Sequence, residues 1–72
     1  MDQEMAQRAT ARGERLRAEL LRRLRSGPQP AAALLPQIEI ADVTLSEVAF
    51  QLDRLAEEGL TVGEQGGPYR LA

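Results

Sequence analysis

Apolar residues recur at helical spacing along the first part of the chain. Leu16, Leu20 and Leu24 fall on one side of a helix, and the residues around them are mostly Ala, Arg, Glu and Gln, which favour helices. We therefore predict one long helix from Gln3 to Ser26. Residues 1–13 lack large apolar residues other than methionine, so we expect them to extend beyond the core or to fray.

The stretch SGPQP, residues 26–30, is predicted to end this helix, because glycine suits a left-handed cap and proline cannot continue a helix. Pro30 can also open the next helix, so AAALLP predicts a short second helix that stops at Pro36. In the segment 37–43, apolar residues alternate with acids, which fits either a short strand or an extended connection. We favour the connection.

The third element begins at Thr44, where TLSE fits a capping box between the threonine hydroxyl and Glu47. Leucine, valine and alanine recur at helical spacing after it, and Gly59 supplies a C-terminal cap, so we predict a helix from Leu45 to Glu58.

Two short strand-like stretches, 60–62 and 69–71, enclose the turn residues GEQGGP and predict a β-hairpin. With 72 residues the chain is long enough for one domain, 1–72, which we expect to be mainly α with a small β-hairpin. Tyr69 is expected to pack at the base of the hairpin. The predicted core consists of Leu16, Leu20, Leu24, Leu34, Leu35, Ile40, Val43, Leu45, Val48, Leu52, Leu55, Leu60, Val62 and Leu71.

Charge divides this chain into two parts. Residues 1–25 carry seven arginines and four acids, whereas residues 26–72 carry two arginines and seven acids. The whole chain has a net charge of −2 and a pI of about 5.0. An acidic balance counts against strong non-specific DNA binding, although it leaves room for a local basic patch.

The composition excludes several kinds of site. There is no cysteine and no histidine, so disulfides, thiolate zinc sites and histidine-dependent catalysis are ruled out. We expect neither an enzyme nor a bound metal or cofactor. No apolar run is long enough for a signal peptide or a membrane span, so the expected location is the cytoplasm.

The run LDRLAEEGL, residues 52–60, followed by TVGEQGGPYRLA, resembles the winged helix-turn-helix family over residues 14–72. Similar endings occur in bacterial transcription regulators of the MarR and ArsR kinds and in the C-terminal winged module of the DNA-processing protein DprA. The resemblance implies three helices plus a two-stranded wing. This chain differs from the family in the connection PQIEIADV, residues 36–43, which is longer than the usual turn between the second and third helices.

In that family the outward face of the third helix enters the major groove of duplex DNA. The resemblance therefore implies a small DNA-binding transcriptional regulator, forming a homodimer through its first helix. Arginine and glutamine can contact guanine and adenine there, and an aromatic edge can meet a thymine methyl group. The candidate DNA-binding residues are Ser46, Phe50, Gln51 and Arg54 on the third helix, Arg70 on the return strand, and Arg12, Arg15 and Arg22 on the first helix.

A second interpretation is a protein-docking module that binds a partner through Phe50 and the acids around it, because an exposed aromatic residue with a polar surround is a common anchor in interfaces. Its acidic rim would be Glu47, Asp53, Glu57 and Glu58. Simpler interpretations remain open as well. The charges can form a solvated surface with Arg54 paired to Glu58, and Phe50 can pack under the first helix.

Overall fold

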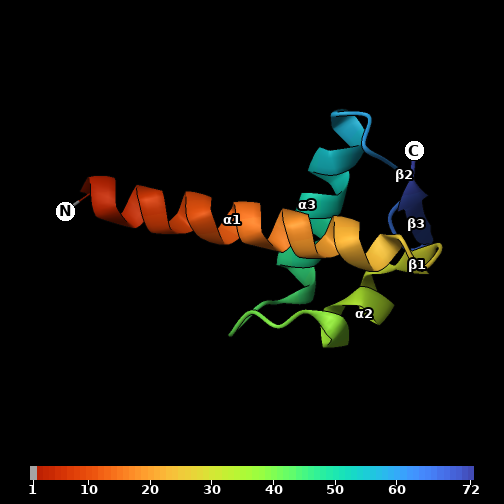
Figure 1. Cartoon of the computed structure of the whole chain (residues 1–72), viewed down its shortest axis with the longest axis horizontal. Coiled ribbons are helices and arrows are strands. Elements are labelled where there is room, and N and C mark those ends of the chain that lie inside the picture. The colour runs from red at the N-terminus through yellow and green to blue at the C-terminus, as the bar shows by residue number, and fades with distance from the viewer. Residues whose placement is uncertain (1) are drawn as a thin grey trace.

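Over residues 2–72, three helices and a small three-stranded antiparallel sheet make up the fold (Figure 1). The computed structural model describes the backbone of residues 2–72 and the side chains of residues 11–72. In chain order the elements are α1 (Asp2–Leu24), β1 (Gln29–Pro30), α2 (Ala31–Leu34), the 3-10 turn η1 (Leu35–Gln37), α3 (Leu45–Glu57), β2 (Thr61–Val62) and β3 (Pro68–Leu71).

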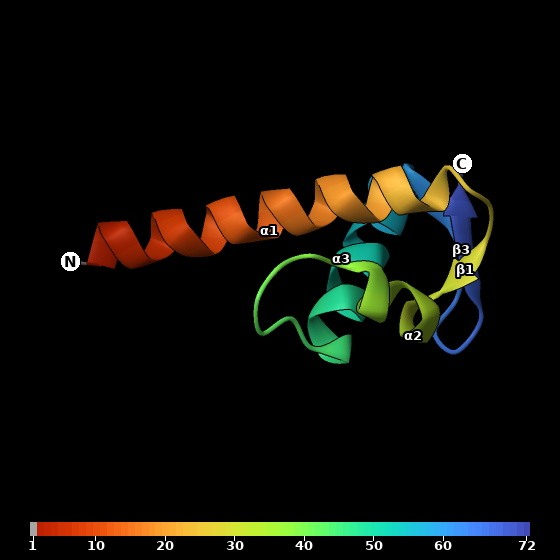
Figure 2. The same ribbon diagram turned by 60° about the horizontal axis from the view of Figure 1, so that its bottom comes forward.

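The long helix α1 crosses α3 and carries the sheet near its C-terminal end, while its N-terminal half extends away from the other elements (Figures 1 and 2). It ends at Leu24, two residues before the predicted end at Ser26. The Gly27 amide donates to the Leu24 carbonyl at 3.1 Å, and Gly27 has a φ of 129°, where a side chain would be strained. The helix therefore ends before SGPQP, as predicted, but Gly27 lies in the turn three residues after the last helical residue and is not its cap.

Both ends of α3 are fixed by the residues that the sequence indicates. The Thr44 hydroxyl accepts from the Glu47 amide at 3.2 Å. At the other end Gly59, with a φ of 80°, donates to the Ala56 carbonyl, and the Leu60 amide donates to the Leu55 carbonyl at 2.9 Å. These two bonds form a Schellman cap, so Glu58 becomes the cap residue instead of the last helical residue.

The sheet has the strand order β1-β3-β2, so the predicted two-stranded hairpin was incomplete. Gln29 pairs with Tyr69 and Pro30 with Pro68. The sequence gives no strand signal at Gln29–Pro30, because two residues show no alternation and both lie in a stretch rich in turn formers. Pairing with β3, which is far away in sequence, creates this strand.

Among residues 11–72, eight buried side chains form the core where the three helices meet the sheet: Leu16, Leu20, Leu24, Leu34, Val48, Leu52, Leu55 and Tyr69. Leu35, Ile40, Val43 and Leu71 are partly buried against them.

Three predicted core residues are exposed instead: Leu45, Leu60 and Val62. Leu45 is the first residue of α3, where little of the fold covers it, and Leu60 follows the Gly59 turn. Val62 lies on β2 beside a buried neighbour, so alternation along the strand turns it to solvent. Tyr69, expected only at the base of the hairpin, is part of the core and 1 % exposed.

The segment 38–44 between η1 and α3 is a connection, as expected, and polar contacts hold it against α1. The buried Glu19 carboxylate accepts from the Glu39 amide at 3.0 Å. Arg12 donates to the Ala41 carbonyl at 2.8 Å. Asp42 has a φ of 61°, which marks a tight reversal in this segment. The extra length of the connection thus becomes an ordered loop along α1.

Gly63, just after β2, has no room for a side chain. A Cβ there would lie 2.7 Å from Tyr69 Cδ1 and 2.8 Å from the Pro68 carbonyl oxygen. We predict that Gly63→Ala lowers the free energy of unfolding by about 1 to 3 kcal/mol, because backbone atoms must move. In a urea titration, the control Gly67→Ala should stay within about 0.5 kcal/mol of the parent, since its Cβ would meet only the Glu64 carbonyl, at 3.6 Å. Equal stability of the two variants would contradict the prediction.

Candidate functional site

The outward surface of α3 carries an exposed aromatic ring and an arginine that act as one unit. Phe50 is 58 % exposed, and the guanidinium carbon of Arg54 lies 5.8 Å from the centroid of its ring. This geometry is a cation–π contact, and it fixes the ring and the charge side by side. Ser46, one turn before Phe50, is exposed on the same helix. Three of the four candidate residues on α3 therefore reach solvent.

Two arginines of α1 hold opposite ends of α3. Arg12 Nε lies 3.3 Å from Glu47 Oε2, and Arg17 Nη2 lies 2.6 Å from Glu58 Oε2. Both pairs are partly exposed, so each contributes little to stability, but each neutralises one acid of the predicted rim. The Glu47 carboxylate thus accepts from Arg12. Among the residues described it accepts no hydrogen bond from the Thr44 amide, so only the threonine half of the predicted capping box forms.

The remaining rim acid near the sheet, Asp53, is also engaged. The Tyr69 hydroxyl donates to Asp53 Oδ1 at 2.9 Å. Burial, this hydrogen bond and the negative charge of Asp53 together raise the pKa of Tyr69 from 10.0 to about 12. Asp53 therefore positions the sheet against α3. The predicted acidic rim is thus largely a set of internal contacts, with Glu57 left exposed on the outward side.

The other candidate residues lie on separate surfaces. Gln51 is partly buried beside α1 and is a close neighbour of Gly13. A Cβ added at Gly13 would lie only 3.2 Å from the Gln51 Nε2. Arg15 and Arg22 are exposed on α1, and Arg22 Nη2 lies 3.8 Å from Glu19 Oε1. Arg70 is exposed on β3 opposite Val62, on the face of the sheet turned away from the buried Tyr69.

The alternative pairing of Arg54 with Glu58 was wrong. Arg54 contacts Phe50 instead, and Glu58 contacts Arg17.

A recess of about 200 Å³ lies between α1 and the outward surface of α3. Its walls include Phe50, Gln51 and Glu47 from α3 and Arg12, Gly13 and Leu16 from α1. Phe50 therefore does not pack under α1, as one alternative held, but forms a wall of an open corner. Such a corner can receive an apolar side chain whose polar neighbours meet the Arg12–Glu47 pair. The sequence could not indicate this recess, because it depends on how α1 crosses α3.

Among residues 11–72 no three acidic side chains come close enough to hold a metal ion. No helix in the described part of the chain is long and apolar enough to cross a membrane.

Comparison with known proteins adds no relative to these observations. The chain matches no family model, no curated protein and no solved structure. Its function must therefore be inferred from the surface of α3 and the elements around it.

Proposed function

We propose that this chain is a winged-helix domain that docks a partner protein through the outward surface of α3. The observation that carries this proposal is the exposed Phe50 ring with the Arg54 guanidinium stacked on it. Aromatic residues and arginines are the side chains most often found at the energetic centre of protein interfaces. The contact between them also holds both side chains in place before a partner arrives, which reduces the entropy lost on binding.

The order of elements supports the winged-helix assignment. In it, α3 is the recognition helix, the β2–β3 hairpin is the wing, and β1 extends the wing by a third strand. We place the domain in the cytoplasm. The surface of α3 is then the one that winged helices use for recognition, whether the partner is a nucleic acid or a protein.

Charge favours a protein over DNA as the partner. Arg12 and Arg17 are already paired with Glu47 and Glu58, so their charges are not free for phosphates. The turn of the hairpin carries Glu64 and no basic residue. A DNA-binding surface instead concentrates unpaired lysine and arginine.

The test compares two exposed apolar side chains. Phe50→Ala should abolish retention of the partner on immobilised protein, because it removes the ring and the support of Arg54. Val62→Ala, which truncates an exposed valine on the sheet, should retain the partner. Proteins bound by the parent and by Val62→Ala but absent with Phe50→Ala, at an unchanged melting temperature, identify the partner. Retention of the same proteins by Phe50→Ala would refute the proposal.

Duplex DNA is the second candidate, because the fold leaves Ser46, Phe50 and Arg54 exposed on α3 and Arg15, Arg22 and Arg70 exposed elsewhere. In a fluorescence anisotropy titration with a duplex, Arg54→Ala would then weaken binding by about 1 to 3 kcal/mol, and Arg22→Ala would reduce the salt slope by about 1. Arg17→Ala is the control, since Arg17 is paired with Glu58. No binding of the parent at low salt would exclude DNA.

A homodimer through α1 belongs to this second candidate, since the N-terminal half of α1 extends beyond the rest of the fold (Figure 1). Sedimentation velocity of the parent and of a chain lacking residues 1–10 would test it. A dimer that becomes a monomer on truncation supports pairing through α1, whereas a monomeric parent excludes it.

A further inference from the structure

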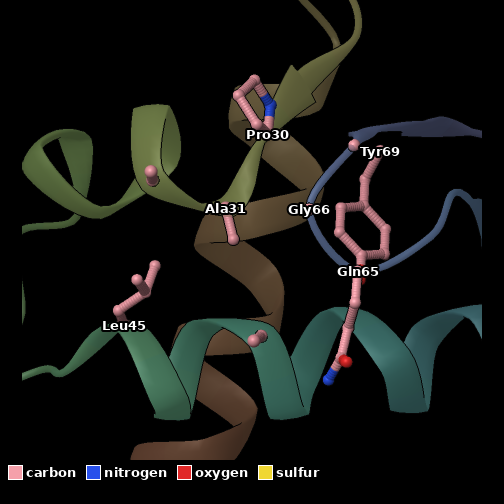
Figure 3. A pocket seen from close by; sticks show the side chains of 9 residues that line it. Pro30, Ala31, Leu45, Gln65, Gly66 and Tyr69 are labelled. Carbon is pink, nitrogen blue, oxygen red and sulfur yellow. The ribbon is translucent and has the colours of Figure 1, made fainter.

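Two of the hollows beside α3 differ in what their linings can recognise. The larger, about 340 Å³, lies between α2, α3 and the hairpin turn, and its lining includes Pro30, Leu45 and Tyr69 (Figure 3). Among residues 11–72 no charged side chain lines it, so its chemistry selects no particular occupant. The recess of about 200 Å³ beside Phe50 instead combines apolar walls with charged side chains. Those charges can select a partner.

Most acids of the outward surface of α3 are engaged within the fold. Glu47 and Glu58 each lie within 3.3 Å of an arginine of α1. Asp53 accepts from the Tyr69 hydroxyl at 2.9 Å, on the side of α3 that meets the sheet. Four acids around Phe50 in the sequence favour a basic partner. The fold removes that preference, because it neutralises two of these acids and directs a third to the sheet.

Arg54 is a charge beside the Phe50 ring that lacks an internal partner of opposite sign. Its guanidinium carbon lies 5.8 Å from the ring centroid, and among residues 11–72 its side chain forms no ion pair. Glu57 is exposed one turn further along α3, but the cation–π contact draws Arg54 back toward Phe50. A guanidinium held against an aromatic ring keeps N–H groups with which to bind a carboxylate in a bidentate pair.

The recess and this guanidinium meet at Phe50. The Phe50 ring forms one wall of the recess, and Leu16 of α1 adds a second apolar surface. The Arg12–Glu47 pair also lines the recess, but it adds no net charge. Arg54 therefore sets the sign of the charge beside the ring. This arrangement complements an apolar side chain that has a carboxylate next to it.

On the basis of the function proposed above, we infer that the partner presents an acidic segment to the outward surface of α3. An aliphatic side chain of this segment enters the recess against Phe50 and Leu16, and an aspartate or glutamate beside it pairs with Arg54. Burial of the aliphatic side chain supplies affinity, and the ion pair selects the sequence. DNA is a poorer match, because α3 carries a single arginine and a phosphate backbone is held by a series of cations.

Selection from a library of random peptides displayed on phage tests this acidic segment. The immobilised full-length chain is the bait, and each recovered peptide is then assayed on Phe50→Ala, so that only peptides that need the ring are kept. We expect these peptides to share an aspartate or glutamate next to an aliphatic residue. Ring-dependent peptides without acids would overturn the proposal and leave the docking function standing. If no recovered peptide needs the ring, the docking function is refuted together with the acidic segment.

Charge reversal separates the effect of Arg54 from that of the overall charge. Arg54→Glu and Arg70→Glu each replace a positive charge with a negative one and so take the net charge from −2 to −4, but Arg70 lies on the sheet face turned away from Tyr69. In anisotropy titrations with the most enriched peptide, Arg54→Glu should weaken binding about tenfold and Arg70→Glu less than about twofold. Equal effects of the two variants would overturn the proposal.

Nucleic acid is the competing occupant of this surface. The labelled peptide is bound to the parent, and an equal concentration of a random-sequence DNA duplex is added at low salt, where phosphate contacts are strongest. We expect the peptide to stay bound. Displacement by the duplex would assign Arg54 to phosphate contact and refute the acidic segment as its partner.

Discussion

Leu52→Ala is expected to lower the free energy of unfolding by about 2 to 5 kcal/mol, which is enough to unfold much of a small domain at room temperature. Leu52 is fully buried at the centre of the core, on the face of α3 that also carries Val48 and Leu55. Removing its side chain leaves a cavity that the surrounding helices cannot close without moving. Urea unfolding followed by circular dichroism measures the effect.

Leu45→Ala is the matched control, since it makes the same change on the same face of the same helix. Leu45 is 46 % exposed, so its truncation should cost no more than about 1 kcal/mol. The helical pattern alone predicts similar losses for the two variants, whereas the fold predicts a difference of several-fold. Equal losses would mean that Leu45 is buried in solution and would contradict the exposure that the fold gives it.

A second large effect is expected at high pH, where the domain should lose about 2 kcal/mol of stability between pH 10 and pH 12. The folded-state pKa of Tyr69 is about 12, against 10.0 for a free phenol. Because the folded state holds the proton more tightly, this contribution is complete below pH 10. It is lost as the pH rises from 10 through the folded-state pKa of about 12, and each unit of difference between the two pKa values corresponds to about 1.4 kcal/mol in total.

The composition makes this experiment easy to interpret. Tyr69 is the single tyrosine, and both lysine and cysteine are absent, so the signal of the ionised phenol belongs to Tyr69 alone. Ultraviolet absorbance of the ionised phenol gives the pKa directly, and urea unfolding at several pH values gives the stability. Tyr69→Phe should show a flat stability over the same range. A phenol that titrates near pH 10 in the folded protein would contradict the burial of Tyr69 and its hydrogen bond to Asp53.

Elements with local signals were predicted well. The Thr44 cap, the Gly59 turn and the apolar face of α3 each depend on residues a few positions apart, so the bounds of α3 followed to within one residue. Pro30 likewise marked the start of α2. The predicted end at Pro36 was wrong, because α2 ends at Leu34 and the 3-10 turn Leu35–Gln37 runs through Pro36. In contrast, β1 and the exposure of Leu45 depend on contacts between distant segments. Strand pairing with β3 has no local pattern in the sequence.

The candidate site, too, was predicted in some parts and missed in others. Helical spacing correctly placed Phe50 and Arg54 on the outward side of α3, but it could not assign partners to the charged residues. Arg12 was considered for phosphate contact because it is basic and lies on a helix. The fold brings it to Glu47 and the Ala41 carbonyl, 35 and 29 residues away in sequence. Whether an arginine of α1 is free or paired depends on how α1 crosses α3, and the sequence alone does not show that crossing.

The very short outer strands of the sheet have a consequence for the behaviour of the protein in concentrated solution. β1 and β2 have two residues each, and Pro30 lacks an N–H group with which to pair another strand. The sheet therefore offers almost no template on which a neighbouring molecule could add a strand. Near pH 5.0, where the chain has no net charge and electrostatic repulsion between molecules is weakest, this geometry should still protect it from fibril formation.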